Sequence, residues 1–553
     1  MNKAFNLAGA VLLMACVASV SADQRTELLK LQHTTLNLIE ALVTEGILSR
    51  ERADQLIAEA EQEAEQQVKQ EERSVADKRD VVRVPYVPEF VKDEIRDEVR
   101  AGLREDVVND VMSQAKNERW GVPGALPEWT SKIKLSGDVR VRWQSDLYAN
   151  NNKDGLYFNF QGANRNGGLI NNQSAILNTT EDRHRARARV RLNLDAKVSN
   201  NIKMGLRLVS GDPNDPVSAN QTLGTDRGKY SASFDRTYLR YKGFDSDTYN
   251  WITLYGGRMP NPWLHTNMVW DSDLNFDGIA STFRYNLTGS DNLYDMDEQD
   301  KNLFFTLGAF PLEEFELSSR DKWLYGAQLG MDWTFQNQSR LRFGVAYYDY
   351  ENITGEKNAL DSRLKDFTAP TFVQKGNTMF EISNDDPASF RKFALGSDYN
   401  ILNMTAKYDI ANFSPTHIIL TADYALNLGY DKNEVIKRTG GVVFNPIEGS
   451  QDPFRKRNRA YKLGVLVGWP KLRERRQWNV SAAYKYLERD AVLDAFTDSD
   501  FHLGGTDAKG WVVSAGYGLD ENTWMRLRWL TSDAIDGPPL GVDTLQLDLN
   551  SRF

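Results

Sequence analysis

The chain has 553 residues, of which 77 are acidic and 67 basic, giving a formal net charge of −10, and its mean hydropathy is −0.54. This composition excludes a bundle of membrane-spanning helices, because no apolar stretch beyond residue 22 is long enough to cross a bilayer. It does not exclude a transmembrane β-barrel, in which half of each strand faces water and the loops are polar.

Residues 1–22 are predicted to be a signal peptide. Lys3 precedes an apolar run, and Val20-Ser21-Ala22 forms a small-residue cleavage pattern, so the mature chain is expected to begin at Asp23. The single cysteine, Cys16, lies within this segment, and its removal leaves no disulfide. An alternative stays open, because the residues before Cys16 loosely resemble a lipoprotein processing site that would keep Cys16 as a lipid anchor.

Residues 23–118 are predicted to form a helical, coiled-coil-like region in the periplasm. Leu28, Leu31, Leu38 and Leu42 give one helix an apolar face. A later helix from Pro88 carries apolar residues that step by four and therefore drift around its surface. Both weak oligomerisation and a solvated charged helix fit this pattern. The Pro-, Gly- and Trp-containing residues 119–131 are expected to be a linker.

Residues 183–198 alternate strictly between basic or polar and apolar side chains. Because a strand turns successive side chains to opposite faces, the segment has one arginine-rich and one hydrocarbon face. The segment 132–143 repeats the pattern, with Arg140 and Arg142 on its polar face. One such strand would suit a soluble sheet, but the same alternation recurs to the end of the chain and therefore predicts a barrel in a membrane.

The alternation predicts an all-β transmembrane antiparallel barrel of about sixteen strands within residues 132–553. The expected strands are 132–143, 183–198, 201–210, 232–243, 249–259, 276–286, 302–310, 321–336, 339–350, 399–409, 416–429, 459–469, 476–488, 508–519, 523–531 and 543–553. Short turns and long loops alternate between them, except at 287–301, where the count is uncertain by two strands. The final residue, Phe553, faces outward and resembles the signal by which the barrel assembly machinery inserts outer-membrane barrels.

A barrel of this size encloses a water-filled channel, so transport of small hydrophilic solutes is the expected function. The predicted pore-lining residues are Arg140, Arg142, Arg183, Arg185, Arg187, Arg189, Arg191, Arg207, Arg236, Arg240 and Arg258. If loop 260–275 folds inward, Asp271 and Asp273, with Asp277 just beyond it, would face these arginines across a constriction and select solutes by charge and size. The arginines predict a preference for anions. Alternatively, the acids stay in solvent and the arginines bind lipopolysaccharide phosphates or are simply hydrated.

Three segments resemble the putative porin family of Gram-negative bacteria: FDRTYLRY at 234–241, GRMPNPW at 257–263 and WDSDLNFDG at 270–278. Members of that family also tend to carry a signal peptide and a helical N-terminal extension. The resemblance implies a diffusion channel in the outer membrane, in contact with lipid and lipopolysaccharide, and supplies no binding residues. Analogy to other sixteen-stranded porins, together with the helical region, favours a homotrimer.

The same residues leave two other functions open. The five histidines lie in unrelated segments without metal-ligand spacing or a nucleophile elbow, so no enzyme, metal or cofactor is predicted, although an outer-membrane lipid hydrolase is a rival. A second rival is a barrel that anchors residues 23–118 while they contact the cell wall or a partner. A gated importer needs a plug domain and more strands. No nucleic-acid partner is expected.

Overall fold

The computed structural model describes residues 132–166, 175–244, 250–287, 301–316, 318–384, 391–444 and 452–553. The predicted signal peptide (1–22), helical periplasmic region (23–118) and linker (119–131) all lie outside the described residues. Within the described ranges, no helix combines the length and the apolar content that crossing a membrane requires.

Sixteen long antiparallel strands form the wall of the fold. They are β1 (Ile133–Tyr148), β2 (Arg183–Lys197), β3 (Ile202–Ser210), β5 (Ala232–Phe244), β6 (Asn250–Pro260), β7 (Asn275–Asn286), β8 (Lys301–Glu313), β9 (Lys322–Thr334), β10 (Arg340–Glu351), β13 (Asn400–Ile410), β14 (His417–Asn427), β15 (Arg459–Gly468), β16 (Trp478–Leu487), β17 (Ala508–Asp520), β18 (Thr523–Ala534) and β19 (Gly541–Arg552). All sixteen predicted strands are present, so the predicted barrel and its strand number are confirmed.

The barrel closes between its first and last strands. β1 pairs with β2 on one side and with β19 on the other, in the register Val141↔Leu549. Because the first and last strands pair, neither is left as an open end of the sheet, which lipid could not hydrogen-bond. β7 and β8 also pair directly, with Asn286 opposite Asn302, which removes the uncertainty of two strands at 287–301.

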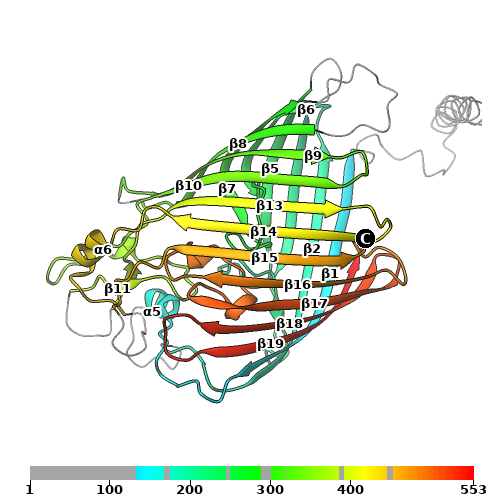
Figure 1. The fold of residues 1–553 in the computed structure, drawn as a ribbon. Helices are drawn as coiled ribbons and strands as arrows, with labels where there is room; N and C mark the ends of the chain where they lie inside the picture. Colours follow the sequence, from blue (N-terminus) through cyan, green and yellow to red (C-terminus); the bar gives the residue numbers. More distant parts are fainter. Residues whose placement is uncertain are drawn as a thin grey trace, which may run out of the picture. The chain divides into compact units, whose positions relative to one another are not determined.

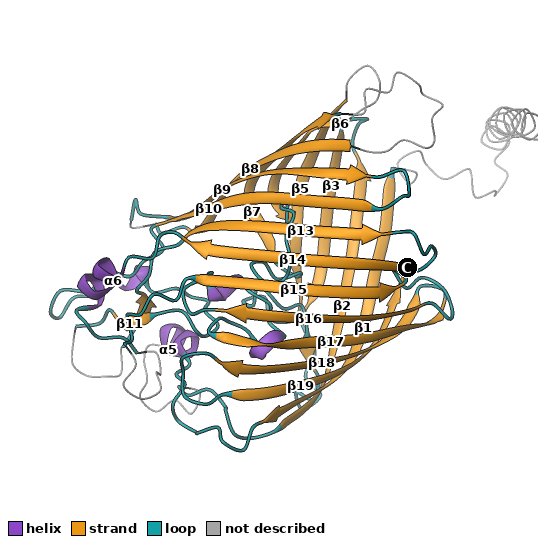
Figure 2. Ribbon diagram, in the orientation of Figure 1, coloured by secondary structure: helices purple, strands orange, loops and turns teal. Residues whose placement is uncertain are grey.

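The two ends of the barrel differ, as Figure 1 shows. One end, here called the loop end, carries the long links 149–182, 211–231, 261–274, 352–399, 428–458 and 488–507. The other, here called the turn end, holds the C-terminus and links such as 198–201 and 521–522. The small elements belong to the loop-end links: α5 (Phe160–Asn166), β4 (Gln221–Thr222), η2 (Asp366–Thr368), β11 (Met379–Glu381), β12 (Phe393–Leu395), α6 (Lys432–Thr439), η4 (Asp494–Phe496) and η5 (Phe501–Leu503) (Figure 2).

Along the strands, exposed apolar side chains alternate with side chains that point into the barrel. On β1, Val141 and Trp143 are 50% and 54% exposed, whereas Arg142 between them is 1% exposed. The exposed face of the barrel is therefore apolar, with exposed aromatic side chains such as Trp251, Tyr285 and Trp511. An apolar band with aromatic residues is typical of a lipid-facing surface.

β1 continues to Tyr148, beyond the predicted end at residue 143. Gln144, Ser145 and Asp146 are all buried, so the alternation that marks the strand stops before the strand does. Backbone pairing of these residues with β2 and β19 extends the strand instead. Parity therefore predicts a strand only where one of its faces is apolar.

An aromatic cluster packs loop 261–274 onto the inside of β7 to β10. Trp270 lies 5.0 Å from Tyr348, and Trp263 lies 6.0 Å from Phe310, both measured between ring centroids. Gly326 on β9 makes room for Trp263, because a Cβ there would lie 2.7 Å from its ring. The cluster fixes the loop inside the barrel rather than above it.

Candidate functional site

Loop 261–274 crosses the lumen. It begins at β6 and ends at β7, yet the main-chain N–H of Leu264 donates to Gln328 of β9 over 2.7 Å. Thr266 donates to Asp423 of β14, and Asn267 accepts from Lys462 of β15 over 2.6 Å. The loop therefore makes contacts across the interior, in the position in which its carboxylates could act on passing solutes.

A second loop, 488–507, folds inward and meets the first. The main-chain N–H of Asp271 donates to the oxygen of Phe496 over 2.8 Å, and the N–H of Ser499 donates to the Asp271 carboxylate over 2.9 Å. Burial, together with the nearby carboxylates of Asp498 and Asp273, raises the pKa of Asp271 well above its ordinary value. The two loops thus form one layer across the lumen.

Asp500 of loop 488–507 attaches this layer to the barrel. Its carboxylate accepts from Arg142 Nη1 over 3.0 and 3.1 Å, from Arg528 over 2.7 Å and from Gln546 over 3.0 Å. Burial opposes the charge of Asp500, but the surrounding arginines outweigh it and hold its pKa well below the ordinary value. Asp500 therefore stays ionised and partly neutralises the basic strands.

Five of the predicted arginines have carboxylate partners inside the barrel. Arg142 also binds Asp548 over 2.6 Å, and Arg185 binds Asp146 over 2.7 Å. Arg189 and Arg191 share Asp138, at 3.0 and 2.8 Å, and both also approach Asp273 of loop 261–274, at 3.6 and 3.2 Å. Arg207 pairs with Asp235. The structure thus brings Asp273 onto the arginine strand, in direct contact rather than across an open gap.

Other predicted arginines have neutral partners. Arg140 donates to Asn220, Arg187 to Gln144 over 3.3 Å, and Arg236 to Asn275 over 2.7 Å. The buried Nε atoms of Arg140, Arg187 and Arg240 have no hydrogen-bond partner among the described residues. These atoms have almost no exposed surface, so they mark a cost of burying arginines side by side in the barrel wall.

Arg258 and Asp277 adjoin this group, because Arg258 Nε donates to the main-chain oxygen of Asp235 over 3.0 Å, but they are more exposed. They pair with each other over 2.6 Å on β6 and β7, with side chains 34% and 51% exposed. Asp277 therefore does not share the buried contacts of Asp271 and Asp273. Phe553 lies on the outside at the turn end, where its ring would contact a Cβ at Gly137, and the two residues exchange main-chain hydrogen bonds of 3.0 and 3.1 Å.

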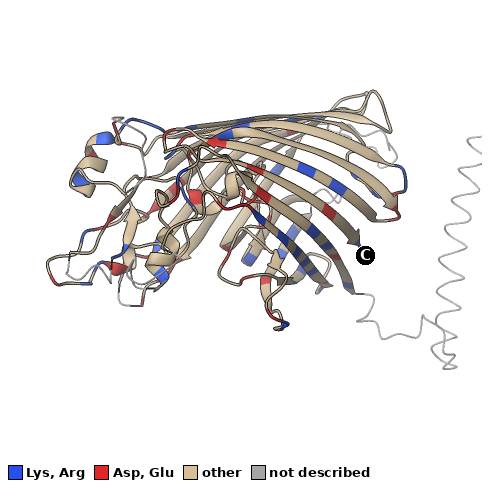
Figure 3. Ribbon diagram, turned by 90° about the horizontal axis from the view of Figure 1, so that it is seen from below, with Lys and Arg blue, Asp and Glu red and all other residues tan. Residues whose placement is uncertain are grey.

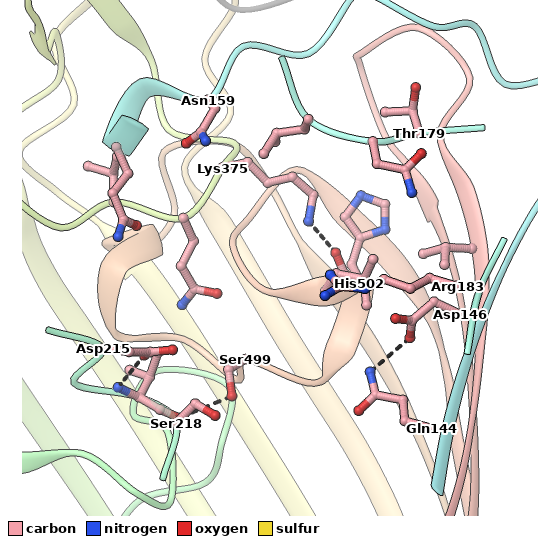
Figure 4. A pocket seen from close by; sticks show the side chains of 18 of the residues that line it. Gln144, Asp146, Asn159, Thr179, Arg183, Asp215, Ser218, Lys375, Ser499 and His502 are labelled. Atoms are coloured by element: carbon pink, nitrogen blue, oxygen red, sulfur yellow. Dashed lines mark hydrogen bonds between the residues drawn. The ribbon is translucent and has the colours of Figure 1, made fainter. Parts of the chain in front are cut away.

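Two cavities lie on opposite sides of the loop layer. The loop-side cavity, of about 400 Å³, is lined by Arg183, Arg185, Arg187 and Lys375 and by three carboxylates, Asp146, Asp212 and Asp215. In Figure 4, Lys375 reaches the main-chain oxygen of His502 at this cavity. The turn-side cavity, of about 540 Å³, is lined by residues of β1, β15, β16, β18 and β19. Bands of basic residues on neighbouring strands are visible in Figure 3.

A protein family described as "Putative porin" matches residues 32–553 of this chain. The chain belongs to this porin family. No curated protein matches it. The chain is similar to solved structures of the outer-membrane channel DcaP of Acinetobacter baumannii (12% identity, TM-score 0.37, covering 76% of this chain and 97% of that one) and of OprB of Pseudomonas putida at high pH (12%, 0.41, 78% and 97%). It is also similar to OmpF of Salmonella typhi in complex with daunomycin (11%, 0.36, 76% and 97%).

Several lumen residues of this porin were not predicted. Lys462, Lys485, Arg526 and Arg528 lie on β15, β16 and β18, and the parity of the predicted strands already turned them inward. Asp498 and Asp500 lie in a loop without periodicity, and no sequence signal placed them in the lumen.

The alternative function of a lipid hydrolase would need a histidine in a catalytic arrangement, so the surroundings of the described histidines are relevant to it. His184 and His502 each lie 3.0 Å from a serine, Ser145 and Ser532. Across the described ranges, neither histidine has a carboxylate hydrogen-bonded to its ring, which a Ser-His-acid arrangement needs. No group of three or more His, Cys, Asp or Glu side chains in these ranges is arranged to hold a metal ion.

Proposed function

We propose that the chain is a non-enzymatic outer-membrane porin that forms a water-filled diffusion channel for small hydrophilic solutes and prefers anions. In this proposal the turn end faces the periplasm, where residues 23–118 also lie. The apolar exterior contacts lipid and lipopolysaccharide, and Phe553 serves as the signal for the barrel assembly machinery.

The observation that carries the anion preference is the surplus of positive charge inside the barrel. Arg140, Arg187 and Arg236 face the interior with neutral partners only, while the carboxylates available in this region already bind other arginines. Like charges at such spacing repel unless mobile counter-ions offset them. Chloride or an anionic solute entering from water would supply that charge, whereas a cation would add to the repulsion.

The test is conductance of the purified full-length protein in planar bilayers. We expect discrete channels whose reversal potential under a KCl gradient reports a chloride permeability above that of potassium. A cation preference would refute the charge assignment, and the absence of conductance from correctly folded protein would refute the channel.

Two further expectations concern assembly and the N-terminal region. We propose a homotrimer, which cross-linking in native membranes would detect as a discrete band of three chains. Deleting residues 23–118 tests whether transport depends on this region or whether the region instead links the outer membrane to the cell wall or a partner. We expect conductance to survive, and if envelope integrity fails while conductance persists, contact with the cell wall is a second role.

A further inference from the structure

The turn-side cavity has an unusual charge composition. Eight basic side chains line it: Arg140, Arg142, Lys462, Lys471, Lys485, Arg526, Arg528 and Arg552. Its only lining carboxylate is Asp548, which binds Arg142 through both oxygens, over 2.6 and 2.9 Å. The loop-side cavity, in contrast, sets four basic groups against three carboxylates. The excess positive charge is thus concentrated on one side of the loop layer.

Three of the eight basic groups form ion pairs with carboxylates of the loop layer. Arg142 and Arg528 bind Asp500, and Lys485 binds Asp498 over 2.5 Å. Each of these carboxylates lies on loop 488–507, which is part of the loop layer. The remaining five basic groups have no carboxylate partner among the described residues.

Their existing contacts are weak or neutral. Lys462 donates to the amide oxygen of Asn267, and Arg526 reaches Asn479 only at 3.5 Å. Arg552 lies over the ring of Trp524 at 5.4 Å. The buried Nε atoms of Arg140 and Arg526 have no acceptor in the described ranges. Five cations without a carboxylate partner therefore point to an anionic ligand with several oxygen acceptors.

We infer that the turn-side cavity is a binding site for a compact multivalent oxyanion, such as a phosphate, a diphosphate or a polycarboxylate. A volume of about 540 Å³ accommodates an ion of this size with part of its hydration shell. Several charges on one ligand can engage several guanidinium groups at once, which a chloride ion cannot do. The inference rests on the proposed channel and adds to it a preferred class of solute.

Binding of an ion inside a channel can be measured as a reduction of the current that other ions carry, here called block. An oxyanion that occupies the cavity lowers the chloride current while it is bound, so its affinity follows from the half-blocking concentration. We choose inorganic pyrophosphate as the probe, with acetate at equal charge concentration as the monovalent reference. We expect pyrophosphate to block the unmodified full-length protein at millimolar or lower concentration, and acetate to leave the current unchanged.

Variants locate the site. Lys462→Gln and Arg526→Gln together remove two cations without carboxylate partners, and we expect the half-blocking concentration to rise about tenfold or more. Arg552→Gln is a second variant closer to the turn end, for use if the double variant does not fold. Lys432→Gln and Lys437→Gln together, on α6 and paired with Asp452 and Glu434, remove the same number of charges and are the control that should leave block unchanged.

The outcomes separate the two proposals. A folded protein without conductance refutes the channel itself. Chloride conductance without pyrophosphate block, or block that the cavity variants leave unchanged, overturns the binding site while the channel stands. Block by acetate as strong as that by pyrophosphate shows that the cavity screens charge without selecting multivalent ions, and also overturns it.

Discussion

Arg142 Nη1 donates to both carboxylate oxygens of Asp500, 358 positions away in the chain, over 3.0 and 3.1 Å. Arg142 belongs to the first strand, and Asp500 to a loop near the end of the chain. The contact joins the wall to the loop layer that divides the lumen into two cavities. It also places a fixed negative charge where the arginines of β1 and β18 meet.

Asp500→Asn is predicted to make the channel more anion-selective. The substitution keeps the shape of the side chain but removes the only carboxylate of Arg528 within the described residues, while Arg142 retains Asp548. We expect the chloride-to-potassium permeability ratio, from reversal potentials, to rise roughly two- to threefold. Asp500→Glu, which keeps the charge, is the control. A ratio that falls in Asp500→Asn would contradict the assignment.

Replacing Arg187, Arg189 and Arg191 together by glutamine is predicted to abolish or reverse the anion preference. The change removes three positive charges and leaves Asp138 and Asp273 without these partners. The loss lowers the positive charge of the lumen by three and frees two carboxylates, which weakens the attraction for anions. Reversal potentials under a salt gradient measure the result. Arg258→Gln, at the half-exposed pair with Asp277, serves as the comparison and should have a smaller effect.

Acidification is predicted to strengthen the anion preference. Burial lowers the pKa of Lys375 to about 7 and raises the pKa of Asp215 to about 6, and both residues line the loop-side cavity. Lowering the pH from 8 to 5 therefore protonates Lys375 first and neutralises Asp215 next, so the cavity gains positive charge in both steps. The permeability ratio should rise in two steps near these values. Lys375→Met should remove the upper step and Asp215→Asn the lower one.

Gly137→Ala is predicted to weaken the closing seam of the barrel. A Cβ at this position would lie 2.6 Å from the Phe553 ring and 2.7 Å from the main-chain oxygen of Arg191, so the chain must shift. We expect a loss of about 1–3 kcal/mol in stability, seen as unfolding at a lower temperature on heat-dependent electrophoresis. An unchanged unfolding temperature would show that the ring moves aside freely.

Phe553→Ser tests the terminal residue separately. Because the side chain is 65% exposed on the outer face, its loss removes little packing. If Phe553 serves as the insertion signal, the amount of assembled protein in the outer membrane should fall several-fold while the unfolding temperature of the assembled fraction stays close to that of the unmodified protein. Normal assembly would contradict this role.

The sequence alone determined the strands and their faces. Alternation of apolar and polar side chains is a local property with a period of two. The sequence alone therefore predicts that Arg183 to Arg191 face the interior and that Leu545 to Leu549 face lipid. The even number of strands and the outward Phe553 follow from the same pattern. The pattern missed extensions at strand ends, such as those of β1 to Tyr148, β8 to Glu313 and β18 to Ala534, where backbone pairing continues beyond the alternation.

The tertiary structure alone decided which charges meet. Loops 261–274 and 488–507 have no period, and their path through the lumen depends on packing such as Trp263 against Gly326 and on hydrogen bonds to distant strands. Asp273 therefore binds Arg191, and Asp500 binds Arg142, through contacts that no local pattern encodes. The turn-side cavity keeps five basic groups without a carboxylate partner among the described residues, because loop 488–507 supplies carboxylates to only three of the eight that line it.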